Sequence, residues 1–316
     1  MKALIIVLLS LFLSFLSGCE NGYYHRPPAE FTEQTTLPEL TEQAFNPEPL
    51  YIQTPAANNY SYVQPPDYLY DTPQVISEYE SPADFEVYKI MGTAESLTGT
   101  RWDNMLAWRA NASDLARQHR SLIYVNKNPA VNAVYLTFDD GPDPVNTVSV
   151  INTLLEYNVS ATFFFTGENI RRHGDIVKKV YDSGFAIGLH GYSHISFKDL
   201  SRDEIIAELT ETNDLLEAIT GRRSVIMRPP FGAIGGREIS VIEEQDLLIY
   251  LWSIDTLDWT QNTEQDILHN IKNHLRPGDI ILMHAFAGQA KSPAVLPEII
   301  EFILTMGYEV RALPWY

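Results

Sequence analysis

The chain has 316 residues, of which 45% are hydrophobic and 20% are charged, so it can bury a sizeable core and is not disordered throughout. It carries 22 lysines and arginines against 41 aspartates and glutamates, and this net charge of −19 excludes the basic face that a nucleic-acid-binding protein needs. A single cysteine, Cys19, excludes an intrachain disulfide framework.

The first 18 residues have the pattern of a secretory signal peptide. Lys2 provides a basic start, and an apolar run from Ala3 to Leu16 follows that is interrupted only by two serines. This run is shorter than the ~20 apolar residues of a transmembrane helix and has the length of a signal-peptide core. We therefore predict a cleaved signal peptide at residues 1–18.

The end of this segment, Leu16-Ser17-Gly18-Cys19, resembles a bacterial lipobox. The resemblance implies that Cys19 is lipidated on its sulfur and becomes the mature N-terminus. Because two or more acyl chains hold a protein firmly on a membrane, we expect an extracytoplasmic protein that is lipid-anchored to the membrane. The alternative is an ordinary secretory signal or anchor in which the cysteine is incidental.

The next segment, residues 19–88, differs in composition from the rest of the chain. Residues 20–88 contain ten of the 19 prolines, one glycine, and twelve acidic residues against one basic residue, Arg26. No apolar period of 2 or 3.6 runs through them, so we predict an extended, self-repelling acidic tether. Its tyrosines could contact cell-wall sugars, although a linker without a partner accounts for the same composition.

Residues 89–130 form a transitional segment with one predicted helix. Trp102, Met105, Leu106 and Trp108 lie near helical spacing, which predicts a helix over 103–119. We expect this helix to pack on the domain that follows.

From residue 131 to 316, apolar strand-like runs alternate with amphipathic segments. The predicted strands are 133–138, 161–165, 185–189, 225–227, 247–254, 279–283 and 308–313. The clearest helix, 201–219, is opened by a capping box of Ser201 and Glu204, and Thr263 and Asp266 open another in the same way. This alternation predicts an α/β fold with parallel strands. Since ~185 residues are few for an eight-stranded barrel of ~250, we expect a distorted, shortened (β/α) barrel with about seven strands.

Chemically active residues follow five of these strands. They are Asp139 and Asp140, then His190 and His194, then Arg228, then Asp255 and Asp258, and finally His284. In parallel α/β barrels the catalytic groups gather at the carboxyl ends of the strands, so we expect these side chains to meet. No glycine-rich phosphate loop opens a helix, so the sequence predicts no bound nucleotide.

The paired aspartates indicate a metal site. Two adjacent carboxylates at the end of an apolar strand repel each other unless one of them is neutralised. Asp140, His190 and His194 would form a three-ligand site for a divalent metal, with positions left open for water. A metal of this kind lowers the pKa of its water toward ~7, and Asp139 could then accept the proton.

The five motifs resemble, in order, those of the polysaccharide deacetylases, the NodB-homology proteins of carbohydrate esterase family 4. The motif segments are 137–142, 190–194, 228–232, 255–259 and 282–284. The resemblance covers about residues 131–316. It implies a distorted (β/α) barrel and an enzyme that hydrolyses N-acetyl groups, or sometimes O-acetyl groups, of a polysaccharide.

The resemblance also assigns roles. It implies that Asp139 is the catalytic base for a metal-activated water and that Asp140, His190 and His194 bind the metal. His284 would be the acid that protonates the leaving amine. Zn²⁺ suits the ligand set best, and Co²⁺, Ni²⁺ or Mn²⁺ fit the same geometry.

Further residues would support this chemistry. Arg228 would position the base, and Asp258 would orient the acid and keep it protonated. Trp259 and Leu282 would wall a pocket for the acetyl methyl group, and the backbone N–H of Phe231 would help to hold the oxyanion. Asp255 is interpreted as a turn or supporting residue rather than as a metal ligand.

Two positions depart from the family pattern. Gly191 stands where Ser or Thr is usual. The missing hydroxyl predicts that the loop of residues 190–194, called the histidine loop below, is looser but keeps its two metal-binding histidines. Phe231 replaces the usual Tyr, which leaves a role for its backbone N–H intact. No catalytic group is lost, so we expect an active enzyme.

Several functions fit these motifs. The first is a metal-dependent deacetylase acting on peptidoglycan N-acetylglucosamine, the polymer nearest to a lipid-anchored enzyme. Chitin-like oligomers and a secreted exopolysaccharide are alternative substrates. The other hypotheses are a catalytically silent glycan-binding envelope lipoprotein, an O-acetyl esterase of the xylan type, and an amidase for small non-sugar substrates.

Overall fold

The computed structural model describes residues 85–260, 263–286 and 291–316. The predicted signal peptide, the lipidation site at Cys19 and the tether up to residue 84 therefore lie outside the described residues. Within the described ranges, no helix is both long enough and apolar enough to cross a membrane.

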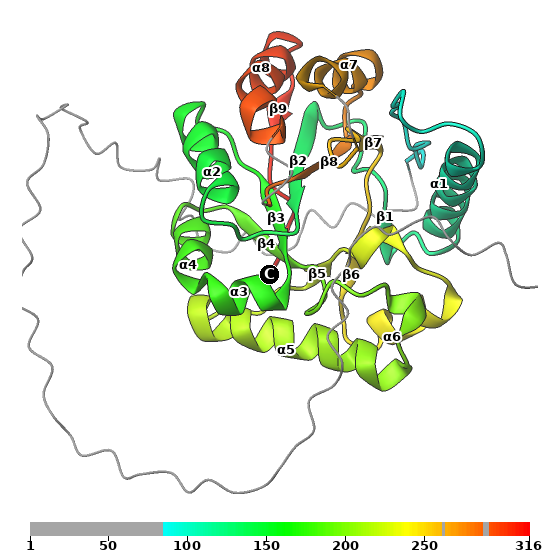
Figure 1. Ribbon diagram of the computed structural model, residues 1–316, viewed down its shortest axis with the longest axis vertical. Helices are drawn as coiled ribbons and strands as arrows, with labels where there is room; N and C mark the ends of the chain where they lie inside the picture. The colour runs from blue at the N-terminus through cyan, green and yellow to red at the C-terminus, as the bar shows by residue number, and fades with distance from the viewer. Residues whose placement is uncertain (1–84, 261–262, 287–290) are drawn as a thin grey trace, which may run out of the picture. The chain divides into compact units, whose positions relative to one another are not determined.

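A parallel sheet forms the centre of the described region (Figure 1). Its strands follow the spatial order β1 (Ile123–Tyr124), β6 (Leu248–Tyr250), β5 (Ile226–Met227), β4 (Ala186–Leu189), β3 (Thr162–Phe165), β2 (Ala133–Asp139), β8 (Ile280–His284) and β7 (Ile254–Asp255). A short β9 (Glu309–Val310) pairs in parallel with the start of β2. The main path thus has eight strands, where the sequence predicted about seven.

The sheet curls, because its two ends are joined by a very short segment. β6 and β7 lie near opposite ends of the strand order, yet only residues 251–253 connect them. Extended residues span at most about 3.6 Å each, so the two ends of the sheet must lie close together. The Leu251 N–H donates to the Tyr124 carbonyl of β1, and the Ser253 N–H donates to the Ile280 carbonyl of β8. The predicted class, an α/β fold with a distorted and shortened (β/α) barrel of parallel strands, is confirmed, and the barrel is a curled half-barrel.

The structure differs from the prediction at the predicted strand 247–254 and at residues 123–124, where no strand was predicted. The predicted strand 247–254 is two strands, since the chain leaves one end of the sheet at Tyr250 and joins the other at Ile254. Periodicity cannot reveal this break, because the connecting residues are as buried as the strands. The two-residue β1 was not predicted, and it brings residues before 131 into the sheet.

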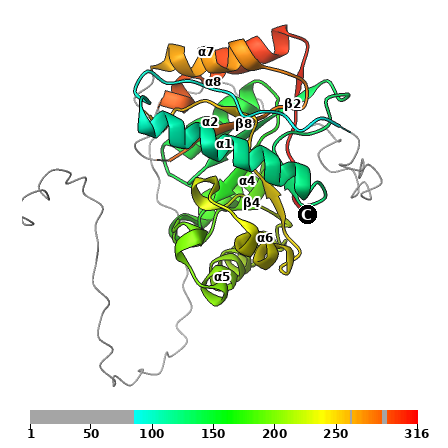
Figure 2. The same cartoon turned by 90° about the vertical axis from the view of Figure 1, so that its right-hand side faces the viewer.

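Eight α-helices occur among the described residues. They lie around the outside of the curled sheet (Figures 1 and 2). They are α1 (Thr100–Gln118), α2 (Asn146–Glu156), α3 (Gly167–Arg172), α4 (Gly174–Asp182), α5 (Arg202–Thr220), α6 (Gly236–Glu243), α7 (Glu264–His274) and α8 (Lys291–Thr305). α1 lies on the side of the fold that carries β1 (Figure 1). The predicted helix over 103–119 is α1.

Local sequence signals set the limits of two helices as predicted. Ser201 caps α5 by accepting from the Glu204 backbone N–H, and the Glu204 side chain returns a bond to the Ser201 N–H. α7 begins with the same capping box at Thr263 and Asp266. α5 ends at Gly221, whose φ of 73° is the left-handed conformation that glycine adopts without strain.

Candidate active site

The predicted functional residues meet at the carboxyl ends of the strands. Asp139 ends β2, His284 ends β8, and the two residues are register partners in the parallel pair. His190 follows β4 directly, and Arg228 follows β5. Because all of these strands run in the same direction, their carboxyl ends share one edge of the sheet, and the side chains that follow them converge there.

Asp140, His190 and His194 form the predicted metal-binding cluster. The Asp140 Oδ1 lies 3.3 Å from the His190 Nε2 and 3.1 Å from the His194 Nε2. The candidate ligand atoms of all three lie within 4.8 Å of one another. The Asp140 Oδ1 is buried without a hydrogen-bond partner, which is costly for a carboxylate unless a cation satisfies it. The donor set therefore fits a divalent metal.

The backbone orients His190 as a ligand. Its Nδ1 lies 2.7 Å from the carbonyl oxygen of Arg228 in a fully buried position. A carbonyl oxygen only accepts, so Nδ1 carries a proton, and Nε2 is the ring nitrogen on the Asp140 side that is left for a metal. Burial acts to raise the pKa of Asp140, but the two imidazoles outweigh burial and hold that pKa well below its usual range.

The loops that carry the site contain strained residues. Asp140, His194, Phe231 and Leu257 have φ values of 70°, 59°, 61° and 57°. Non-glycine residues adopt this left-handed region at a cost, and such strain clusters at functional sites. Four of the six described non-glycine residues with positive φ belong to these loops.

Arg228 holds the candidate base Asp139. The Arg228 guanidinium is fully buried, and its Nη1 donates to the Asp139 Oδ1 over 2.6 Å and to the Thr137 Oγ1 over 2.9 Å. Its Nε and Nη2 donate to the carbonyls of Tyr250 and Leu251, each over 2.9 Å. With these donors satisfied in fixed positions, the guanidinium cannot rotate. One oxygen of the Asp139 side chain is therefore held in place by a charged donor.

Asp258 holds the candidate acid His284. The Asp258 Oδ1 lies 2.8 Å from the His284 Nδ1, and its Oδ2 accepts from the His284 backbone N–H over 2.8 Å and from the Ser292 hydroxyl. Burial acts to lower the pKa of His284, but the carboxylate of Asp258, together with those of Asp140 and Asp139, outweighs burial and raises the pKa to about 10. His284 is therefore protonated at neutral pH, and its Nε2 is the ring atom left to act on a substrate.

The three predicted pocket residues lie on different loops and strands. Phe231 is 63% exposed, and its ring makes an edge-to-face contact with the His194 ring, with the ring centroids 4.6 Å apart. Trp259 is 40% exposed, and its Nε1 donates to the Asp255 Oδ1 over 3.3 Å. Leu282 is buried within β8. Their roles as walls of an acetyl pocket and as an oxyanion donor stay predictions.

A hollow of about 200 Å³ opens beside the metal-binding cluster. Its lining includes Asp140 and His194 together with residues of α3, the histidine loop and the segment after β8: Thr166, Glu168, Asn169, Arg172, Tyr192, Ser193 and Phe286. The hollow mixes charged, amide and aromatic groups, which are the groups that bind sugar hydroxyls and ring faces. It is therefore a candidate space for part of a glycan.

Glu208 holds the loop between His190 and His194, although no sequence motif points to it. It comes from α5, and its carboxylate accepts from the Tyr192 N–H over 2.6 Å, the Ser193 N–H over 2.9 Å and the Ser193 hydroxyl over 2.6 Å. Gly191 has a φ of 70°, and a Cβ there would lie 3.1 Å from the Glu208 Oε2. The histidine loop is thus held by Glu208, with a glycine that fits against it. The available signal was an acidic residue beside the buried stripe of a predicted helix.

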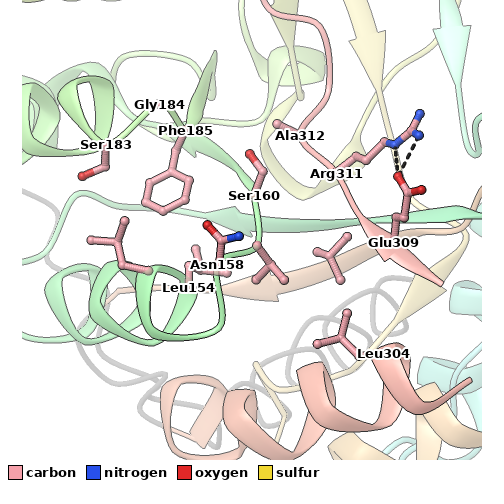
Figure 3. A pocket seen from close by; sticks show the side chains of 13 residues that line it. Leu154, Asn158, Ser160, Ser183, Gly184, Phe185, Leu304, Glu309, Arg311 and Ala312 are labelled. Atoms are coloured by element: carbon pink, nitrogen blue, oxygen red, sulfur yellow. Dashed lines mark hydrogen bonds and ion pairs between the residues drawn. The ribbon is translucent and has the colours of Figure 1, made fainter. Parts of the chain in front are cut away.

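A larger cavity of about 550 Å³ lies elsewhere in the fold (Figure 3). Its lining is mostly apolar and includes Leu154, Phe185, Leu304 and Val310, and an ion pair joins Glu309 and Arg311 at its edge. None of the predicted site residues lines this cavity. It is separate from the candidate active site.

Comparisons with known proteins agree with this geometry. A family model described as polysaccharide deacetylase matches residues 126–248. Two peptidoglycan-N-acetylglucosamine deacetylases of Bacillus cereus are similar: one is 36% identical over 57% of this chain and 66% of its own length, and the other is 33% identical over 56% and 68%. The chain belongs to the polysaccharide deacetylase family, which confirms the predicted family and enzyme class.

A solved structure supports the fold assignment. The crystal structure of a peptidoglycan N-acetylglucosamine deacetylase in complex with a naphthalenyl N-oxidanyl-benzamide superposes with a TM-score of 0.60. It is 33% identical, and the match covers 61% of this chain and 91% of that one. The curled parallel sheet is thus the fold of a known deacetylase.

Proposed function

We propose that this protein removes N-acetyl groups from the amino sugars of an extracytoplasmic polysaccharide, with peptidoglycan N-acetylglucosamine as its substrate. One observation carries the proposal: Asp139 and His284 are register partners on adjacent strands, where Asp139 contacts the Arg228 guanidinium and His284 contacts the Asp258 carboxylate. Arg228 holds one oxygen of Asp139 in place, and Asp258 favours a protonated His284. A base and an acid side by side are what hydrolysis of an amide requires.

Asp140, His190 and His194 would hold a divalent metal, and Zn²⁺ suits one carboxylate and two imidazoles best. Such an ion would polarise the acetyl carbonyl and make water acidic near neutral pH. The buried, unsatisfied Asp140 Oδ1 supports this assignment. Co²⁺, Ni²⁺ and Mn²⁺ fit the same donors.

The chain's own groups would move the protons. Asp139 accepts a proton from the attacking water, whose oxygen bonds to the acetyl carbon. The backbone N–H of Phe231 donates to the oxyanion that develops. The bond from carbon to nitrogen then breaks as the His284 Nε2 gives its proton to the leaving amine. The products are acetate and a free amino sugar.

Two other functions fit the same site. A silent glycan-binding protein would need neither an acid nor a base, and both groups are present with their partners. An O-acetyl esterase would use the same groups on an alkoxide leaving group, so the choice between N-acetyl and O-acetyl depends on the substrate. Turnover on defined substrates separates these functions.

The test is acetate release by the full-length chain in detergent. The substrates are an N-acetylglucosamine oligomer, isolated peptidoglycan and acetylated xylan, each with added Zn²⁺ and then with chelator. We expect chelator-sensitive acetate from peptidoglycan. Acetate only from xylan would favour the esterase. Zn²⁺ binding without acetate from any substrate would favour the binding protein.

We also propose that the protein is lipid-anchored through Cys19 on the outer side of the membrane. The lipobox-like end of the apolar leader supports this proposal, and so does the acidic, proline-rich composition of the segment that follows. An anchored enzyme on a long tether would reach the glycan of the surrounding wall.

A further inference from the structure

Helix α1 contacts two active-site loops through adjacent residues. Trp108 contacts the loop of residues 228–232, which carries Arg228 and Phe231, and Arg109 contacts the turn of residues 255–259 after β7. α1 precedes residues 126–248, the part matched by the family model. The residues of α1 that make these contacts therefore lie outside the part of the chain that the family model matches.

Trp108 holds the first loop at Gly232. The Trp108 Nε1 donates to the Gly232 carbonyl oxygen over 3.0 Å, and its ring packs 5.0 Å from that of Trp252. Gly232 has a φ of 62°, and a Cβ there would lie 2.5 Å from the Trp108 ring. The loop is thus pressed against the indole, one residue after Phe231.

Arg109 is the counter-charge of a buried carboxylate. It is 6% exposed, and its Nη2 lies 3.7 Å from the Oδ2 of Asp255, which is 1% exposed. Its Nη1 donates to the Gly92 carbonyl over 2.8 Å, whereas its Nε and Nη2 are buried without a hydrogen-bond partner in the described part of the chain. Burial raises the pKa of Asp255 and the Arg109 guanidinium opposes that rise, so Arg109 offsets part of the cost of placing a carboxylate in this buried position.

Asp255 holds the turn of residues 255–259 through two hydrogen bonds. Its Oδ1 accepts from the Leu257 backbone N–H over 3.0 Å and from the Trp259 Nε1 over 3.3 Å. Leu257 has a φ of 57°, so this hydrogen bond supports a strained residue directly before Asp258. The path from Arg109 through Asp255 thus ends at the partner of His284 and at the exposed Trp259.

The segment before α1 closes the same edge of the sheet. Met91 pairs in parallel with Ile254, and the Asp255 N–H donates to the Met91 carbonyl over 2.9 Å. Gly92 has a φ of 125°, and a Cβ there would lie 2.1 Å from the Asp255 carbonyl oxygen. Residues 91–92 are therefore held tightly against the start of the turn of residues 255–259.

We propose that Trp108 and Arg109 are positioning residues of the active site, which α1 supplies from outside the family-matched region. Neither touches the reacting groups. Trp108 fixes the loop of Phe231, and Arg109 fixes the turn of Asp258 through Asp255. The roles of these loops rest on the proposed deacetylase function, but the positioning itself can be tested without turnover.

The test compares Arg109→Met with Arg117→Met in the full-length chain. Arg117 is an exposed arginine of the same helix that pairs with Asp114, so its variant controls for loss of a guanidinium. We expect kcat to fall about tenfold in Arg109→Met with little change in KM, because the reacting groups are misplaced while glycan contacts remain. Arg117→Met should keep the wild-type kcat.

A second change separates positioning from general destabilisation. Asp255→Asn leaves an oxygen that accepts from Leu257 and Trp259 but needs no counter-charge, so adding it to Arg109→Met should restore part of kcat. Hydrogen exchange at the Leu257 amide should speed up in Arg109→Met and stay at the wild-type rate in Arg117→Met. In Trp108→Phe, the amides of Gly232 and Ala233 should exchange faster, with kcat about threefold lower.

Wild-type kcat and unchanged exchange in Arg109→Met would overturn the inference. So would a fall in kcat that matches the fraction of unfolded protein and is not restored by Asp255→Asn. If the wild-type chain releases no acetate from any glycan, the proposed function fails, while the exchange measurements still decide whether α1 positions the two loops.

Discussion

At the scale of single residues, the two adjacent aspartates differ through their partners. Asp139 is bound by the Arg228 guanidinium, whereas Asp140 turns its unsatisfied oxygen toward His190 and His194. The intervening backbone makes this possible, because Asp140 adopts a φ of 70° at the end of β2. Neighbours in sequence thereby take different chemical tasks.

The first prediction tests this division of tasks. Asp139→Asn should lower turnover by a factor on the order of 10³ or more, because the base is lost, while Zn²⁺ affinity stays near the wild-type value. His190→Ala should lose both turnover and Zn²⁺ binding. Acetate release and Zn²⁺ titration calorimetry measure the two quantities. Equal loss of metal affinity in the two variants would refute the assignment.

The second prediction concerns the pH dependence of the acid. The pKa of His284 is raised to about 10, so His284 is protonated below that value, and activity should fall as the pH rises through its pKa. Asp258→Asn removes the carboxylate that raises this pKa. The alkaline limb of the profile of kcat against pH should therefore move to lower pH. An alkaline limb at the wild-type position would show that His284 is not the acid.

At the scale of elements, a helix outside the motifs holds the histidine loop. The Glu208 carboxylate on α5 collects three donors from residues 192–193, directly between the two histidines. From the sequence, Gly191 is expected to leave this loop loose. The structure instead shows a clamp, and the positive φ of Gly191 brings the loop close to Glu208.

The third prediction tests this clamp. Glu208→Gln weakens three charge-assisted hydrogen bonds and should reduce Zn²⁺ affinity about tenfold, which is the usual effect of losing a group that orients metal ligands. Glu211→Gln is the matched control, because Glu211 lies on the same helix and pairs only with the exposed Arg171 among the described residues. Titration calorimetry measures both variants. Equal affinities would show that the loop holds itself.

At the scale of the whole molecule, the curl of the sheet assembles the site. The ends of the strand order meet through residues 251–253, so the turn after β7 and the loop after β5 lie on one rim although they come from different parts of the sheet. α1 then covers this side and contacts both. The half-barrel is therefore completed by a helix from the N-terminal region.

The fourth prediction concerns the anchor. Metabolic labelling with palmitate should mark the wild-type chain. The mass of the mature protein should correspond to a chain that begins at residue 19. Cys19→Ser should lose both the label and this cleavage, because the sulfur that carries the lipid is gone. Ser14→Ala, inside the apolar run, is the control and should be labelled normally. An unlabelled wild-type chain would refute the lipid anchor.

The sequence by itself determined the local features and the chemistry. Helix caps and strand periodicity depend on short-range geometry. Residues close together in the sequence therefore predict the capping boxes of α5 and α7 and the motifs at the strand ends. The candidate acid, base and metal ligands could be named for the same reason. They follow strands whose parallel direction brings their ends together.

Only the tertiary structure decided which distant residues support that chemistry. The break between β6 and β7, the clamp from Glu208 and the contacts of Trp108 and Arg109 depend on how far the sheet curls and on which helix lies against which loop. Buried polar pairs such as Arg109 and Asp255 have no period in the sequence, since their partners are 146 positions apart. Their positions follow from packing, which satisfies buried charges wherever the fold brings them together.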